Sequence, residues 1–153
     1  MAHNGRIFIA GGSDDNRTSM EMYDPTTNTW TLVKPMSTAR DYLAMAHFDG
    51  RIWAMGGNDG NRNLNSCESY DPNTDQWQPE SAMLANRSHF KAIEFNGELY
   101  ALGGGWQSGL PFRYTMETYV PSQGWTMVGD MPDKSYWAMS LVVIPNIFDV
   151  FKV

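Results

Sequence analysis

One sequence pattern occurs three times along this chain of 153 residues. In each copy a glycine opens a short apolar run that ends in a double glycine, and a tyrosine and a tryptophan follow further on. The opening glycines are Gly5, Gly50 and Gly97, which lie 45 and 47 residues apart. A repeat of this length is typical of an array of like structural units, so it constrains the fold more than any other feature.

The apolar runs predict strands that are covered on both faces. Between Gly5 and Gly12, Ile7 and Ile9 share one face of a strand while Phe8 and Ala10 share the other. A strand with one face in water would alternate apolar with polar residues, which these runs do not. Each unit supplies four short strands joined by turns, which is the make-up of one β-propeller blade.

The order of these residues resembles the kelch repeat. Each unit carries the double glycine, a Glu-x-Tyr sequence and a tryptophan, and the first two units carry Asp-Pro directly after the tyrosine. The resemblance implies an all-β fold in one domain, a propeller of four-stranded antiparallel blades with three kelch blades per chain, or half of a six-bladed ring. The repeats would span about 5–49, 50–96 and 97–145, followed by a non-repeat tail at 146–153.

The third unit departs from the pattern in two places. Val120-Pro121 stands where the other units have Asp-Pro. Ser135 stands ten residues after its tryptophan, where the first two units have Arg40 and Arg87.

The kelch resemblance also carries an expectation about assembly. In kelch blades the strand after the arginine is the innermost one, so we expect this chain to begin on outer strands and to end on an inner strand. Two copies would then close one ring as a homodimer, with residues 136–144 of each completing the first blade of the other. The alternative, that the chain is an excerpt of a longer kelch protein, stays open.

Kelch propellers bind ligands with loops on one rim, so the resemblance places candidate ligand-binding residues after the double glycines and around the arginines. The loops after the double glycines lengthen from unit to unit, a pattern typical of a binding face. The loop candidates are Arg17, Asn58, Arg62, Trp106, Gln107, Phe112 and Arg113. The turn candidates are Arg40, Asp41, Tyr42, Arg87, Ser88, His89, Lys134, Ser135, Tyr136 and Trp137.

Two interpretations of Arg40 and Arg87 stay open. Arginines around a pocket would suit an acidic peptide through charge-assisted, bidentate hydrogen bonds. Alternatively, each arginine pairs with a glutamate that recurs inside the blades, because a recurring buried charge must be paired. The recurring glutamates are Glu21, Glu68 and Glu117.

Composition weighs against several classes of partner. The net charge is −6 and the sequence pI is near 4.9, which disfavours nucleic acid and anionic membranes as partners. The single cysteine, Cys67, rules out an internal disulfide and fits a reducing compartment. No run is long enough to span a membrane and no signal peptide is apparent, so we expect an intracellular, cytoplasmic protein.

No catalytic or metal-binding pattern competes with the repeat. The three histidines lack metal-ligand spacing, and the strand of Cys67 aligns with Met20 and Met116, which predicts a buried, inert thiol. Some kelch-type propellers carry metal chemistry, but this chain shows no corresponding ligand set. We therefore expect no enzyme activity, no cofactor and no metal.

The resemblance implies a protein–protein interaction module that binds a peptide or protein. One such role is substrate recognition in a cullin-3 ubiquitin-ligase adaptor, although the BTB and BACK domains of such adaptors are absent from these 153 residues. The alternative is an actin-associated structural kelch protein.

Overall fold

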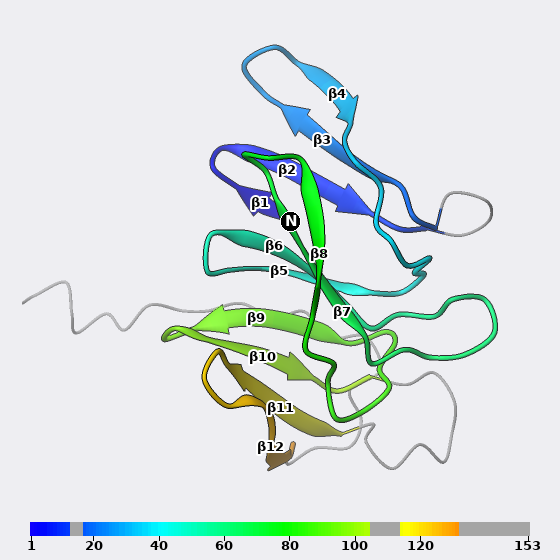
Figure 1. Ribbon diagram of the computed structural model, residues 1–153, viewed down its shortest axis with the longest axis vertical. Coiled ribbons are helices and arrows are strands. Elements are labelled where there is room, and N and C mark those ends of the chain that lie inside the picture. Colours follow the sequence, from blue (N-terminus) through cyan, green and yellow to red (C-terminus); the bar gives the residue numbers. More distant parts are fainter. Residues whose placement is uncertain (13–16, 105–113, 132–153) are drawn as a thin grey trace, which may run out of the picture.

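The computed structural model contains three four-stranded antiparallel sheets that follow one another along the chain (Figure 1). It describes residues 1–12, 17–104 and 114–131. The first sheet has the order β1 (Ala2–His3), β2 (Arg6–Ala10), β3 (Met20–Asp24) and β4 (Thr29–Leu32). The second has β5 (Ala44–Phe48), β6 (Arg51–Met55), β7 (Cys67–Asp71) and β8 (Gln76–Glu80). The third has β9 (Lys91–Phe95), β10 (Glu98–Leu102), β11 (Thr115–Val120) and β12 (Gly124–Asp130).

These sheets are the first, second and third blades of a propeller arc, as the repeat predicts. Because β5 pairs with β6 and β9 with β10, the second and third sheets each combine the last strand of one sequence repeat with the first strands of the next. Among the described residues, no helix is long and apolar enough to cross a membrane.

A two-residue turn joins the first two strands of every blade. Asn4-Gly5, Asp49-Gly50 and Asn96-Gly97 all have positive φ at both positions. That geometry is a type I′ turn, whose twist matches the twist of the flanking strands and which favours Asn-Gly and Asp-Gly. These turns lie on the left of the blades in Figure 1.

The first blade has an inner strand of its own, so the expectation that the chain begins on outer strands is wrong. In β1, Ala2 lies opposite Ile7 and His3 opposite Arg6. The strand covers only part of the edge of β2, because it has two residues where β5 and β9 have five. The Asn4-Gly5 dipeptide was the signal that predicts it, since a type I′ turn needs a strand on either side.

Apolar residues of neighbouring blades pack face to face. Phe8 of the first blade contacts the cluster that contains Ile52 of the second, and a larger cluster joins the second blade to the third. Strand β6 is therefore buried on both faces, as predicted. The same prediction is wrong for β2, where Ile7 and Ile9 are 43% and 48% exposed. This face is the one that a preceding blade covers in the second and third blades.

The repeated tyrosine and tryptophan of each blade face each other across two strands. Their ring centroids lie 5.1–5.4 Å apart, in Tyr23–Trp30, Tyr70–Trp77 and Tyr119–Trp125. The Trp77 indole also donates to the Lys34 carbonyl of the preceding blade at 2.7 Å. These rings are buried or partly buried in the second and third blades, whereas Trp30 is 50% exposed.

Candidate functional site

The loops after the double glycines meet the turns before the inner strands on one side of the blades. The Asp41 N–H donates to the Asn58 carbonyl at 2.8 Å, and the Asn58 N–H donates back to Asp41 at 2.7 Å. We call this side, made by residues 37–43, 57–66 and 84–90, the loop rim. Its loop between β6 and β7 lies on the right in Figure 1, away from the two-residue turns.

Arg40 lies beneath the loop rim, where it connects the first blade to the second. It has 0% exposure, and its Nε donates to the Glu68 carboxylate at 3.1 Å. One of its terminal nitrogens donates to the carbonyls of Gly56 and Ser66 at 2.7 and 2.9 Å. The Glu68 carboxylate also accepts from the N–H of Ser37 at 2.8 Å. The guanidinium is thus enclosed by groups of the following blade.

Arg87 repeats this arrangement between the second and third blades. It is 1% exposed, and its guanidinium lies 2.8 Å from the Glu117 carboxylate. It also donates to the carbonyls of Gly103 and Thr115. Burial lowers the pKa of Arg87, and the charge of Glu117 counteracts that effect.

The geometry supports the structural interpretation of both arginines. Each pairs with the glutamate of the following blade, in the pairs Arg40–Glu68 and Arg87–Glu117. Both charges are neutralised away from solvent, so neither guanidinium is presented to a ligand at the loop rim. The prediction of an acidic peptide ligand depended mainly on these two arginines. Because both are buried, they do not support it.

Two aromatic side chains beside these arginines do face solvent at the loop rim. Tyr42 and His89 each lie two residues after an arginine, and their rings stack with centroids 3.8 Å apart and an interplanar angle of 18°. The His89 N–H donates to the Tyr42 carbonyl at 3.0 Å, so backbone and rings together link two blades. Tyr42 is 53% exposed, and His89 is also exposed.

Both residues of this pair adopt an unusual backbone conformation. Tyr42 has φ of 53° and His89 has φ of 54°. Left-handed conformations are uncommon outside glycine and cost about 1–3 kcal/mol, and they concentrate at functional sites. Partial burial lowers the pKa of His89, while the nearby Asp41 carboxylate raises it.

Ser88, a predicted site residue between Arg87 and His89, is buried, with an exposed fraction of 2%.

The loop after β6 is held in shape by its own side chains. The Asn58 side-chain oxygen accepts from the N–H of Gly60 at 2.7 Å, and its amide nitrogen donates to Asn63 at 3.0 Å. The Asp59 carboxylate accepts from the N–H of Asn61 and Arg62, which keeps the pKa of Asp59 below its usual value.

Arg17 and Arg62 both contact Asp59 of this loop. Arg17 donates to the Asp59 carbonyl at 3.3 Å, which ties the first blade to the second. Arg62 lies 3.6 Å from the Asp59 carboxylate, and its side chain is 80% exposed. The structure thus brings five predicted residues together around the loop and the stacked pair. They are Arg17, Asp41, Tyr42, Asn58 and His89.

The remaining predicted site residues lie outside the described residues. They are Trp106, Gln107, Phe112, Arg113, Lys134, Ser135, Tyr136 and Trp137.

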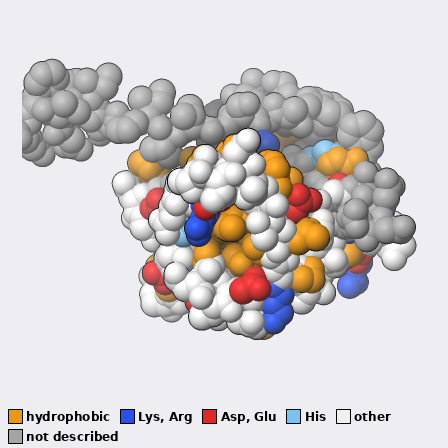
Figure 2. Space-filling model, turned by 90° about the horizontal axis from the view of Figure 1, so that it is seen from above, with side chains coloured by type: hydrophobic (Ala, Val, Ile, Leu, Met, Phe, Trp, Pro, Cys, Tyr) orange, Lys and Arg blue, Asp and Glu red, His pale blue; other side chains and the backbone are white. Residues whose placement is uncertain are grey.

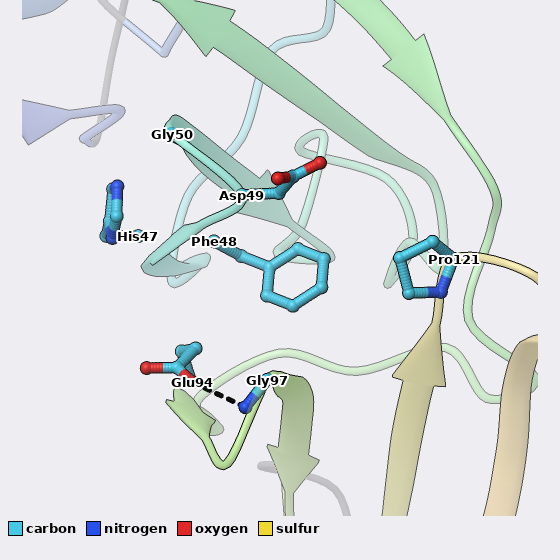
Figure 3. Close-up of a pocket in the computed structure, with 7 residues that line it drawn as sticks. All are labelled: His47, Phe48, Asp49, Gly50, Glu94, Gly97 and Pro121. Carbon is cyan, nitrogen blue, oxygen red and sulfur yellow. Dashed lines mark hydrogen bonds between the residues drawn. The ribbon is translucent and has the colours of Figure 1, made fainter.

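Two hollows accompany this part of the structure. A polar one of about 170 Å³ lies on the loop rim, lined by Arg62, Asn63, Leu64, Asn65, Ser66 and Asn86. A second, of about 350 Å³, lies on the side of the two-residue turns and was not predicted (Figure 3). It is lined by His47, Phe48, Asp49, Gly50, Glu94, Gly97 and Pro121. The feature of the sequence that lies closest to this hollow is the pair of two-residue turns Asp49-Gly50 and Asn96-Gly97, which contribute to its lining.

The described residues contain neither a metal-binding cluster nor an exposed cysteine. They contain no group of three or more histidine, cysteine or acidic side chains that could hold a metal ion. Cys67 is 4% exposed, and burial raises the pKa of its thiol to about 12. The expectation of a buried thiol is confirmed.

Comparison with known proteins finds the kelch motif at residues 1–37 and 39–84. The F-box protein AFR of Arabidopsis thaliana is 37% identical over 60 residues, 39% of this chain and 16% of that protein. Kelch-like protein 1 of Mus musculus is 45% identical over 47 residues, 31% of this chain and 6% of that protein. The influenza virus NS1A-binding protein homolog of Mus musculus is 35% identical over 60 residues, 38% of this chain and 9% of that protein. The chain spans less than a fifth of these relatives.

A solved structure, that of YjhT, has a TM-score of 0.73 at 20% identity, over 86% of this chain and 49% of that chain. The likeness shows the fold, and the three blades match about half of the other chain. Because the motif covers more than half of its residues, this chain belongs to the kelch-repeat family. The kelch motif and the kelch-like relatives agree with the propeller blades seen in the structure.

Proposed function

We propose that this chain is a non-enzymatic recognition module that binds a peptide or protein ligand on the loop rim. The observation that carries the proposal is the stacked pair Tyr42–His89, exposed at a junction between two blades and held in strained conformations. Exposed tyrosines that are rigidly supported are frequent hot spots of protein interfaces, each contributing about 2 kcal/mol or more.

A displayed peptide library selected on the immobilised chain provides ligands for the test. Fluorescence polarisation then gives the Kd of selected peptides for the wild type and for Tyr42→Ala. We expect Tyr42→Ala to weaken binding about 30-fold, the equivalent of a hot spot of about 2 kcal/mol. Phe95→Ala is the matched control, because Phe95 is an exposed ring near the opposite turns. Equal losses for the two variants, or none for Tyr42→Ala, would contradict the proposal.

For the cellular role, we propose substrate recognition in a cullin-3 ubiquitin-ligase adaptor. The support is the kelch motif at residues 1–37 and 39–84 together with the similarity of a 47-residue stretch to kelch-like protein 1. Co-precipitation of cullin-3 with the complete protein tests this role. Binding to filamentous actin in a sedimentation assay, without recovery of cullin-3, would instead favour an actin-associated kelch protein.

The ligand site is complete, in this proposal, only when the blades form a closed ring. A second copy in a homodimer and additional blades from a longer chain are the two ways of closing it. The similarity to about half of a larger propeller chain is consistent with both. The mass of the assembly in solution distinguishes them, since a homodimer has twice the chain mass of 17.3 kDa.

A further inference from the structure

The hollow on the side of the two-residue turns lies between the second and third blades, away from the loop rim (Figure 3). Gly50 from the turn of the second blade and Gly97 from the turn of the third both line it. Its volume of about 350 Å³ is near the lower limit for ligand pockets. A hollow of this size between two ordered turns suits a single side chain of a partner better than a large ligand.

Apolar groups form the floor and one wall of the hollow. Phe48 is 5% exposed, and its ring meets Trp53 and Tyr119 edge-on at centroid distances of 5.8 and 5.9 Å. Pro121, in the turn between β11 and β12, adds an exposed apolar surface. Figure 3 shows the Phe48 ring between the two turns. The floor is therefore fixed by its own packing, and it suits the aliphatic part of a long side chain.

Two carboxylates from different blades border the hollow. Asp49 belongs to the turn after β5, Glu94 belongs to β9, and both are exposed. One Glu94 oxygen accepts from the Gly97 N–H at 2.8 Å, which holds this side chain beside its turn. Within residues 1–12, 17–104 and 114–131, neither carboxylate forms an ion pair. No lysine or arginine of the described chain lines the hollow, so its charge is negative.

Other parts of the surface balance their charges. On the end face of the first blade, Figure 2 shows basic side chains beside acidic ones. Arg6 and Asp24 of that blade, for example, lie 3.1 Å apart. The unbalanced carboxylates of the hollow are therefore a local feature of one junction.

The corresponding place between the first and second blades carries neither carboxylate. Asn4 stands there at the position of Asp49, and His47 stands at the position of Glu94. The His47 ring stacks with that of His3 at a centroid distance of 4.4 Å. Because the first junction packs without the two carboxylates, blade packing does not require them.

The groups around the hollow add to its preference for a donor of positive charge. The Nε2 atom of His47, in the lining, is buried, and no described residue forms a hydrogen bond with it. In the tautomer that has its proton on Nδ1, this atom is an acceptor. Burial raises the pKa of Tyr119 beneath the floor, and the charges of nearby groups, Asp49 among them, raise it further.

We propose that the hollow binds a basic side chain, arginine or lysine, of a protein partner. The charged end pairs with Asp49 and Glu94, and the aliphatic part lies on Phe48 and Pro121. A cation near the face of an aromatic ring gains further attraction. The net charge of −6 also favours the approach of a basic partner. This second site shares no residue with the loop rim, so it does not depend on the proposed function.

Three short peptides serve as probes for this site. They are acetyl-Gly-Arg-Gly-amide and its counterparts with lysine and with glutamine in place of the arginine. The NMR amide signals of Gly50 and Gly97 report binding, because both glycines line the hollow. We expect saturable shifts of these signals with at least one basic peptide and none with the glutamine peptide, which is neutral and of similar size.

Two conservative variants remove the charges and keep the turns. Asp49→Asn gives the second blade the Asn-Gly sequence of the other two turns, and Glu94→Gln keeps an acceptor for the Gly97 N–H. Each variant should raise the Kd of the basic peptide about fivefold, the effect of one exposed ion pair. Asp130→Asn is the matched control, because it removes an equal charge at the opposite end of β12. It should leave the Kd unchanged.

Three results would overturn the proposal. The first is the absence of shifts with both basic peptides, and the second is an equal response to the glutamine peptide. The third is a Kd that neither Asp49→Asn nor Glu94→Gln raises, or that Asp130→Asn raises equally. Tyr42→Ala should not change the Kd of the basic peptides, because Tyr42 lies on the loop rim. The two proposed sites can therefore fail separately.

Discussion

Arg40 and Arg87 show how a buried charge can serve blade packing. Removing a guanidinium from water costs several kcal/mol unless a carboxylate and further hydrogen bonds replace the lost hydration. Here a glutamate and backbone carbonyls of the next blade supply those bonds. An arginine can make all these contacts at once because its donors lie in one plane. These residues therefore couple each blade to the next rather than to a ligand.

Two histidines give the stability of the fold a predictable dependence on pH. Burial lowers the pKa of His3 and of His89 below the usual 6.5, and for His3 the stacked His47 lowers it further. The unfolded chain therefore binds protons before the folded chain does as the pH falls below about 6.5. We expect Tm to fall between pH 7.5 and pH 5.5, measured by differential scanning calorimetry.

The double variant His3→Asn/His89→Asn serves as the control for this prediction. Asparagine tolerates the left-handed backbone at position 89, so the variant removes the titrating groups without removing the turn. Its Tm should change much less over the same pH interval. The carboxylates with lowered pKa, such as Asp24 and Asp71, titrate at lower pH and do not contribute in this window. A Tm that rises on acidification would contradict the assignment.

At the scale of elements, glycines in the same blade have different physical roles. Gly50 and Gly56 both have positive φ, at 72° and 57°. A methyl group added to Gly50 would meet nothing within 4 Å, whereas one added to Gly56 would clash with the Arg87 carbonyl and the Phe90 ring. The first glycine permits a turn, and the second permits close approach of two blades.

Urea unfolding of Gly50→Ala and Gly56→Ala tests this distinction. Gly50→Ala should cost about 1–2 kcal/mol, the strain of a left-handed alanine alone. Gly56→Ala should cost at least about 2 kcal/mol more, because the neighbouring blade must also move. Equal losses in the two variants would indicate that blade packing at Gly56 is looser than the structure shows.

At the scale of the whole molecule, the arc of three blades ends in an apolar face that is not covered. Leu32 and Ile9 on this face are 72% and 48% exposed, while Ala54, which corresponds to Ile9 in the second blade, is 0% exposed. Exposed apolar patches of this kind mark association surfaces. In the proposed function this face matters, because the proposed ligand site on the loop rim lies at junctions between neighbouring blades.

Replacing both exposed residues in Ile9→Ser/Leu32→Ser should therefore leave the free energy of unfolding within about 1 kcal/mol of the wild type. The variant should also bind less of the dye ANS, whose fluorescence reports exposed apolar surface. Ile52→Ser, at a buried isoleucine of the second blade, is the control and should lose about 3 kcal/mol or more, because it places a cavity and a hydroxyl in a packed interface. A comparable loss in the first variant would show that its face is covered in solution.

Several features of this protein follow from local sequence. The spacing of the repeat predicts three blades, and the apolar runs on both faces predict that blades stack, as β6 confirms. Asn4-Gly5 encodes a hairpin even though its first strand has only two residues. Such features depend on neighbouring residues, whose geometry is set by local sterics.

The choice of partners, by contrast, was decided only by tertiary structure. The sequence offers three glutamates to Arg40, and only the stacking of blades selects Glu68. The same stacking brings the rings of Tyr42 and His89, which lie 47 residues apart in the sequence, to a centroid distance of 3.8 Å. It also buries Arg40 and Arg87 between blades, away from the candidate ligand site. The repeat alone thus determined that this chain builds kelch blades. Which charged residues lie buried between blades, and which aromatic residues are exposed at the loop rim, depends on contacts between distant segments that exist only once the blades have packed.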